Sequence, residues 1–172
     1  EGYGLTSVTI GSGITTLPDE VFSDCALTSV TIPTNITAIG EGVFGNCAGL
    51  TSVIVPDHVT SIGGGAFSGC TGLTGITIGN HVATIGDYEF SGCTSLASVT
   101  IPASVTALGA QEFVYCNSLT NITVDAANLV YSSLNGNLFN KARTTLIEYA
   151  SGIPDNSYTV PRGVTSIAAD AF

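Results

Sequence analysis

The chain has 172 residues, of which 44% are hydrophobic and only 9% are charged, so it is not a disordered acidic tail. Thirteen acidic residues against three basic ones, Lys141, Arg143 and Arg162, give a net charge of −10. So little base on an acidic surface argues against nucleic acid or an anionic membrane as a partner. Thr, Ser and Gly interrupt every apolar stretch, so we also expect no membrane insertion.

A repeat of 22 or 23 residues runs from the beginning of the chain through most of its length. Its leading leucines are Leu5, Leu27, Leu50, Leu73, Leu96 and Leu119. A period in this range is typical of leucine-rich-repeat solenoids, in which each repeat packs only against its neighbours. We therefore predict an α/β fold, namely a single right-handed leucine-rich-repeat solenoid over 1–172, with regular repeats over 5–118.

Each copy contains a strand, then a bend, then a segment that leads back to the strand of the next copy. In the copy at 50–72, Val53 and Val55 alternate with outward residues, as in a short strand that has one face inward. The glycines at 63–65 allow a tight bend, and we expect 66–70 to return as a short helix or 3₁₀ turn. Strands from successive copies are then expected to stack as a parallel sheet.

Two residue types recur at fixed positions and predict core columns. The phenylalanine column, which we expect to lie entirely inside, comprises Phe22, Phe44, Phe67, Phe90, Phe113 and Phe172. The cysteine column comprises Cys25, Cys47, Cys70, Cys93 and Cys116. Because side chains in such a column run parallel and do not converge, we expect buried free thiols in preference to disulfides.

Two aligned pairs of ionisable residues offer little chemistry. His58 and His81 fall at the same position of consecutive copies, and are either exposed turn residues or a weak metal or pH-sensing site; whether they bind a metal stays open. Glu89 and Glu112 also align, and we expect them to be solvated surface acids. Neither pair has a nucleophile or a set of metal ligands beside it, so we predict no enzyme and no cofactor.

The outward strand positions predict a shallow partner-binding surface. The candidate residues on it are Thr31, Ser52, Ile54, Thr77, Ser98 and Thr100. A solvated face rich in strand-forming Thr is the plainer interpretation. A Thr ladder also resembles ice-binding surfaces, although Ile54 interrupts it.

The regular pattern ends in an irregular insertion at 119–154, followed by a truncated repeat at 155–172. Asn135-Gly136 is a strong turn signal and predicts a β-hairpin, and a second hairpin is expected around 141–143. The insertion holds candidate partner-binding anchors, which are Tyr131, Phe139, Lys141, Arg143 and Tyr149. Alternatively, the insertion only covers the end of the sheet.

The unit L-T-S-V-T-I-P-x-x-V-T-x-I-G-x-x-A-F-x-x-C, which recurs over 5–118, closely resembles BspA-like leucine-rich repeats. Glu89 and Glu112 depart from the resemblance, since Ala is usual there. The resemblance implies an extracellular or cell-surface recognition or adhesion module that binds host, matrix or partner proteins, or glycans. The alternative is a structural spacer that projects other domains. No methionine is present and the chain stops within a repeat, so we expect a piece of a longer protein whose uncapped repeats can self-associate end to end.

Overall fold

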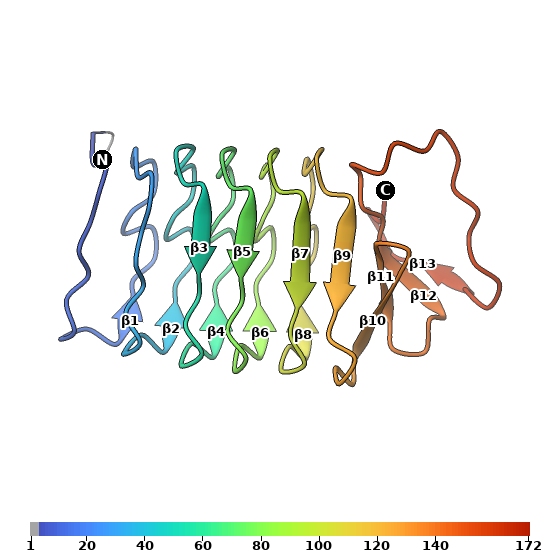
Figure 1. Cartoon of the computed structure of the whole chain (residues 1–172). Helices are drawn as coiled ribbons and strands as arrows, with labels where there is room; N and C mark the ends of the chain where they lie inside the picture. The colour runs from blue at the N-terminus through green and yellow to red at the C-terminus, as the bar shows by residue number, and fades with distance from the viewer. Residues whose placement is uncertain (1–3) are drawn as a thin grey trace.

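The computed structural model describes residues 4–172 as a stack of coils, each of which contributes a front segment and a back strand (Figure 1). The front strands are β3 (Ser52–Ile54), β5 (Gly75–Thr77), β7 (Ser98–Ile101) and β9 (Asn121–Val124). The back strands are β1 (Thr16–Leu17), β2 (Ala38–Ile39), β4 (Ser61–Ile62), β6 (Thr84–Ile85) and β8 (Ala107–Leu108). The C-terminal strands are β10 (Tyr131–Leu134), β11 (Asn137–Asn140), β12 (Thr145–Glu148) and β13 (Ser166–Ile167).

Parallel pairing between coils confirms the predicted solenoid. At the front, Val53 pairs with Ile76 across β3 and β5. At the back, five strands pair in the order β1-β2-β4-β6-β8, in which Ile62 lies opposite Ile85. The second sheet was not foreseen, although the back pair Ser61–Ile62 follows the same in-and-out alternation as the front strands.

The expectation of helical or 3₁₀ returns is wrong, because residues 4–172 contain only strands, turns and irregular segments. The returning segments contain isolated turns, such as the one in which Ser68 N donates to Gly65 O at 3.0 Å, and their other backbone groups bond to the next coil. Phe44 N donates to Ala66 O at 2.8 Å, and Phe67 N donates to Glu89 O at 3.2 Å. An α-helix needs consecutive bonds within one segment, and these backbone groups are already used along the stack.

Columns of like residues fill the interior between the two sheets. Phe44 and Phe67 are fully buried, and their rings stack with centroids 5.4 Å apart. The prediction that all repeat phenylalanines lie inside fails at Phe172, which is 67% exposed because no further coil packs over it among the described residues. Phe22, near the other end, is half-buried.

All five cysteines are free and buried, as the column predicts. Each thiol from the second copy onward points to a phenylalanine carbonyl of the preceding coil; Cys70 Sγ, for example, lies 3.1 Å from Phe44 O. Burial raises the pKa of Cys70 to about 12. These thiols are therefore packing residues and not nucleophiles.

The corners of the coils require the left-handed backbone conformation twice per coil. The first corner position is held by Glu20, Gly42, Gly65, Tyr88 and Gln111, with φ between 55° and 63°. The second is held by Asp24, Asn46, Gly69, Gly92 and Tyr115, with φ between 58° and 74°. Gly and Asn adopt this conformation most readily, whereas tyrosine does so at a cost.

The chain leaves the regular stack at Asn128, which takes the place held by Val105 one coil earlier. Its side-chain amide donates to Pro102 O at 2.8 Å and to Val105 O at 2.9 Å. Its Oδ1 accepts from Val130 N and Tyr131 N at 2.9 and 2.8 Å. One buried asparagine thus ties the last regular coil to the start of the terminal hairpin.

The predicted Asn135-Gly136 hairpin is confirmed, with β10 and β11 antiparallel and both turn residues at positive φ. We call residues 128–150 the cap. Its hairpin covers groups of the last coils: Ile122 N donates to Gly136 O at 2.8 Å, and Val124 N donates to Ser133 Oγ at 3.2 Å. β12 then pairs antiparallel with β11 and parallel with β13, which resumes the repeat.

Candidate functional site

The outward positions of the front strands form the first candidate surface. All six residues predicted there are exposed, namely Thr31, Ser52, Ile54, Thr77, Ser98 and Thr100. Parallel pairing brings Ser52 beside Gly75 and Ile54 beside Thr77. Ile54 is 68% exposed in a row otherwise made of hydroxyl side chains, so it is the apolar point of this face.

A groove of about 460 Å³ runs beside Ile54, between the front segment at 29–32 and β3. The front ladder is interrupted here: Thr31 bridges to Thr9, and β3 pairs with β5, but no strand pairing joins 29–32 to β3 in the described chain. Residues from both sides of this interruption line the groove, and Thr31, Ser52 and Ile54 are three of them. Three predicted candidates therefore meet at one concave place.

The two histidines lie at the turns below the front strands and are exposed. His58 lines the end of the groove, and His81 Nδ1 lies 3.0 Å from Asp57 O. Within residues 4–172, no group of three or more His, Cys, Asp or Glu side chains could hold a metal ion. Both histidines are thus exposed turn residues, which is one of the two interpretations of the sequence.

The insertion residues expected as anchors are mostly used within the cap. Phe139 is fully buried, so its assignment as a surface anchor is wrong; it packs with Leu146 and Ala171 in a small second core. Tyr131 is half-buried, and its hydroxyl accepts a bond from Leu108 N at 3.0 Å. An aromatic residue flanking a hairpin signal does not reveal which face the hairpin turns inward.

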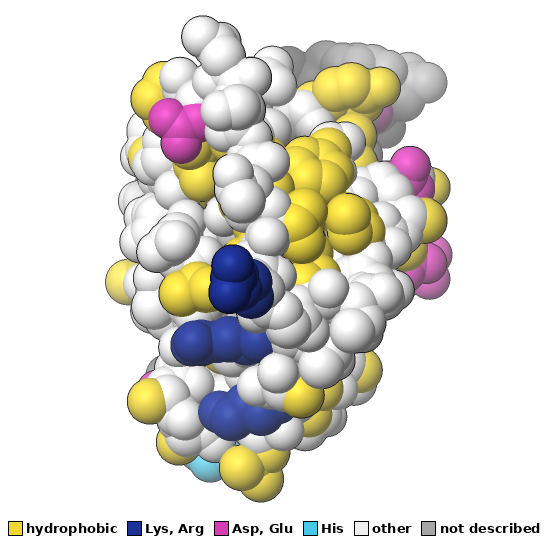
Figure 2. Space-filling model, turned by 90° about the vertical axis from the view of Figure 1, so that its right-hand side faces the viewer, with side chains coloured by type: hydrophobic (Ala, Val, Ile, Leu, Met, Phe, Trp, Pro, Cys, Tyr) yellow, Lys and Arg dark blue, Asp and Glu magenta, His cyan; other side chains and the backbone are white. Residues whose placement is uncertain are grey.

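The basic side chains gather on the end face of the molecule (Figure 2). Lys141 Nζ donates to Ala126 O at 3.2 Å and also to Asn128 O. Arg143 Nη2 donates to Ser133 O at 3.1 Å. These two cations therefore donate hydrogen bonds to backbone carbonyl groups in and beside the cap, although their side chains remain exposed. Tyr149 is half-buried at the edge of the same region.

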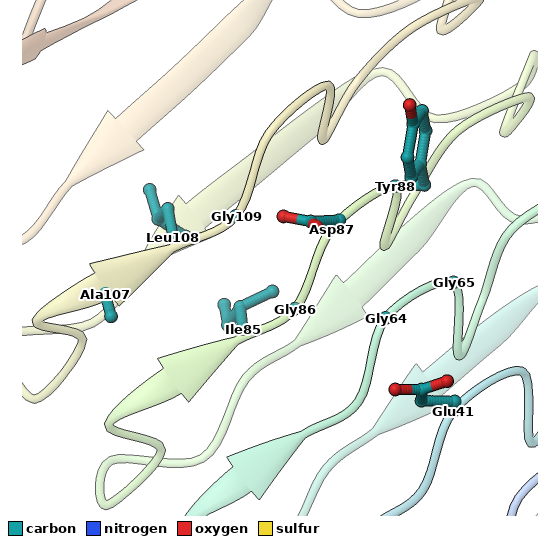
Figure 3. Close-up of a pocket in the computed structure, with 10 residues that line it drawn as sticks. All are labelled: Glu41, Gly64, Gly65, Ile85, Gly86, Asp87, Tyr88, Ala107, Leu108 and Gly109. Carbon is teal, nitrogen blue, oxygen red and sulfur yellow. The ribbon is translucent and has the colours of Figure 1, made fainter.

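A hollow of about 610 Å³ lies at the corner of the back sheet, with Glu41, Asp87 and Tyr88 around a glycine-rich wall (Figure 3). Stacking explains the glycines, since a Cβ on Gly64 would lie 2.9 Å from Asp87 O. Asp87 Oδ1 is likewise occupied, because it accepts from Ala110 N at 2.8 Å. The hollow is thus a product of coil packing.

Glu89 and Glu112 are not the solvated surface acids that we expected; they are 0% and 5% exposed. They occupy the inward position that Val43 and Ala66 hold in earlier coils. Each carboxyl group accepts a hydrogen bond from the preceding coil. Ala66 N donates to Glu89 Oε2 at 3.1 Å, and Glu89 N donates to Glu112 Oε2 at 3.3 Å. The second oxygen, Oε1, of each has no partner.

Burial raises the pKa of both carboxyl groups: that of Glu112 rises to about 8, and that of Glu89 lies well above its usual value. Buried carboxyls can act as acids in catalysis only if a substrate reaches them. These two are enclosed among core side chains, so they serve the stack. The apolar identity of Val43 and Ala66 at the same position was the sequence signal for burial.

Two exposed aromatic residues were missed by the sequence reasoning. Tyr88 is 48% exposed and Tyr115 is 71% exposed, each at a left-handed corner position. Their positions could have been found from the repeat, because Gly42 and Gly65 precede Tyr88, and Gly69 and Gly92 precede Tyr115, at the same phases.

No helix long and apolar enough to cross a membrane occurs in the part of the chain that the structure describes. Among curated proteins, none matches this sequence. Solved structures do match. The pneumococcal vaccine antigen PcpA is similar with a TM-score of 0.88 and 28% identity, over 96% of this chain and 42% of that protein's chain.

Two further bacterial structures are similar. A leucine-rich cell surface protein from Faecalibacterium prausnitzii matches with a TM-score of 0.61 and 26% identity, over 94% of this chain and 59% of that one. The T. pallidum leucine-rich repeat protein matches with a TM-score of 0.68 and 25% identity, over 96% of this chain and 70% of that one. The chain thus spans less than half of PcpA's crystallised length.

A family assignment from the sequence agrees with these likenesses. It also agrees with the stacked coils and with the columns of leucine, phenylalanine and cysteine. The family described as BspA type leucine-rich repeat region matches residues 1–78 and 37–172, in six copies. Proteins of this family are typically non-enzymatic repeat proteins that serve in protein interaction. The chain belongs to the BspA-type leucine-rich-repeat family.

Proposed function

We propose that this chain is a recognition module at a bacterial cell surface, that it binds a protein partner in extended contact, and that it catalyses nothing. The partner lies along the front face and takes Ile54 as its central apolar contact. Family membership supports a role in protein interaction. The likeness to a vaccine antigen and to a cell surface protein supports an extracellular position.

The groove beside Ile54 carries the proposal. It is concave, it joins two front segments that do not pair with each other, and it has Thr31 and Ser52 as hydroxyl-bearing neighbours. An apolar side chain surrounded by groups that donate and accept hydrogen bonds is the usual composition of a small interface centre. A partner side chain seated in the groove would exclude water from Ile54.

The remaining exposed Ser and Thr positions on β5 and β7 extend the contact along the stack. Hydroxyl side chains contribute little each, so the affinity of one chain is expected to be modest. Adhesive surface proteins overcome weak single contacts by presenting many repeats and many copies, which raises the effective concentration.

The test is binding of purified extracellular-matrix proteins to the immobilised chain, measured by interferometry. Ile54→Glu should weaken binding by about tenfold, which corresponds to the loss of one central contact. Thr84→Glu, an exposed position on back strand β6, adds the same charge away from the face and is the matched control. Equal effects of both variants would contradict the front face, and no binding by the unaltered chain would favour the spacer.

A further inference from the structure

The coil that passes through the cap is two residues shorter at its corner than the regular coils. In a regular coil, Ile62 pairs with Ile85, and Phe67, five residues later, donates to Glu89 O. In the cap coil, Leu146 pairs with Ile167, and Tyr149, three residues later, donates to Ala171 O. The cap coil therefore lacks two residues at its corner, where the regular coils place the residue with the left-handed conformation.

The missing residues leave a hollow between the corners on either side. Gln111 reaches across the short coil, and its Nε2 donates to Asp170 Oδ2 at 2.6 Å. The hollow beside this bridge has a volume of about 580 Å³. Tyr88, Tyr115 and Tyr149 line it together with two phenylalanines, Phe113 and Phe172. We call it the tyrosine groove.

The two outer tyrosines of the groove stand where the fold prefers glycine. Tyr88 has φ of 58°, and Tyr115 has φ of 63°. A side chain in this conformation costs roughly 1–2 kcal/mol compared with the ordinary helical or extended regions. Neither ring recovers this by burial, since both residues are exposed. Strain without packing gain is a feature that binding sites commonly retain.

Two carboxyl groups that have no basic partner among the described residues also line the groove. Glu148 and Asp170 both line it, and Glu148 is half-buried. Burial first, and the nearby Asp170 carboxylate second, raise the pKa of Glu148 to about 8. The neighbouring bases donate to backbone carbonyl groups, Lys141 to that of Ala126 and Arg143 to that of Ser133. A cation from outside the chain would therefore meet the Asp170 carboxylate, and its charge would favour ionisation of Glu148.

We propose that the tyrosine groove binds a lysine or arginine side chain presented by an extended basic segment of a protein partner. Tyrosine faces attract such cations, and the effect strengthens where water is excluded. Glu148 and Asp170 complete the complement in charge and in hydrogen-bond acceptors. A neutral sugar could stack on the rings, but it would leave the Asp170 carboxylate without a counter-charge. The groove lies at the corner face, so it is independent of the front-face contact proposed above.

The test uses the full chain and a fluorescein-labelled eight-residue peptide of alternating lysine and glycine, with fluorescence anisotropy as readout. Tyr88→Gly combined with Tyr115→Gly installs the residues found at the same positions of neighbouring coils, so folding should be retained. We expect the peptide affinity to fall at least about tenfold, while the melting temperature stays equal or rises. If the rings served only to stabilise the fold, the double substitution would lower the melting temperature.

Non-specific attraction to an acidic protein requires its own control. Glu148→Gln with Asp170→Asn removes both ionisable carboxyl groups from the groove, whereas Glu20→Gln with Asp24→Asn removes two exposed carboxyl groups at the far end of the stack. We expect at least about tenfold weaker binding for the groove pair and less than about twofold for the distant pair at physiological salt. Equal losses, undiminished binding of an acetyl-lysine version of the peptide, or no peptide binding by the unaltered chain would each overturn the proposal. So would neutral glycans that bind in a tyrosine-dependent way in its place.

Discussion

Coils of the regular stack are joined mainly by backbone groups, whereas side chains make several of the bonds that join the cap to the stack. Thr60 N donates to Thr37 O at 2.9 Å, as its counterparts do in later coils. At the cap, the side chains of Asn128, Tyr131 and Ser133 bond to backbone groups of the last coils or of the hairpin itself. The difference shows that the regular stack can be interrupted without a helix, at a position where an asparagine replaces a core valine.

The comparison predicts its largest effect inside the stack. Phe67→Ala leaves a cavity within a column of stacked rings and should lower the free energy of unfolding by about 3–5 kcal/mol in chemical denaturation. Phe172→Ala, at an exposed ring of the same column, is the control and should cost less than about 1 kcal/mol. Similar losses for the two variants would show that the column is not a shared core.

A pH effect of a few kcal/mol should come from the buried carboxyls. Because the folded pKa of Glu112, about 8, exceeds the usual value of 4.5, stability is greatest below about pH 4.5 and declines as pH rises towards 8. Each unit of difference corresponds to about 1.4 kcal/mol. Denaturation at several pH values should reveal this slope.

Glu89→Gln with Glu112→Gln should flatten that slope, because neither side chain then ionises. Glu20→Gln with Glu41→Gln, which alters exposed acids, should leave it nearly unchanged. A slope that survives in the first pair would place its origin elsewhere in the molecule.

The cap should open by itself when Asn128 is replaced. Asn128→Val restores the regular column but removes four hydrogen bonds, and leaves Val130 N and Tyr131 N without their acceptor. We expect a loss of about 1–3 kcal/mol, confined to the cap. Hydrogen exchange should become faster in β10 and β11 and stay slow in β4 and β6. Uniformly faster exchange would mean that stack and cap form one cooperative unit.

The smallest effect is a gain. Tyr115→Gly relieves a left-handed tyrosine that buries little, so the free energy of unfolding should rise by about 1 kcal/mol. Gly92→Tyr, the reverse change one coil earlier, should lower it by a similar amount. A loss of stability in Tyr115→Gly would mean that the ring packs against its neighbours in solution.

Sequence reasoning predicted the parts of the fold that the repeat determines. Inward columns such as Leu50 and Phe67 follow from identity and phase, because only apolar residues of constant size stack every coil. The Asn135-Gly136 hairpin followed from local turn chemistry. These features depend only on the phase of a residue in the repeat or on neighbouring residues, and both can be read from one sequence.

The errors arose where a residue's partner lies in another coil. Residues 66–70 resemble a helical turn when read alone, yet only isolated turns form there, because Phe67 N and Gly69 N bond to the next coil. Glu89 was placed outside on its charge, although the peptide N–H of Ala66 offered it a buried donor. The tyrosine groove depends on a two-residue shortening, which becomes visible only when the register between β12 and β13 is known. The predicted front-face residues are exposed, and their role in binding stays a prediction.

The bonding of the returning segments to the next coil has a consequence for how the chain folds. With no helix to form early, a single coil gains almost nothing until the next has wound against it, and each such contact closes a loop of about 23 residues. The first productive event is thus the pairing of two coils. Once that pair exists, each later coil finds a template already in place, so folding should begin slowly and then propagate along the stack.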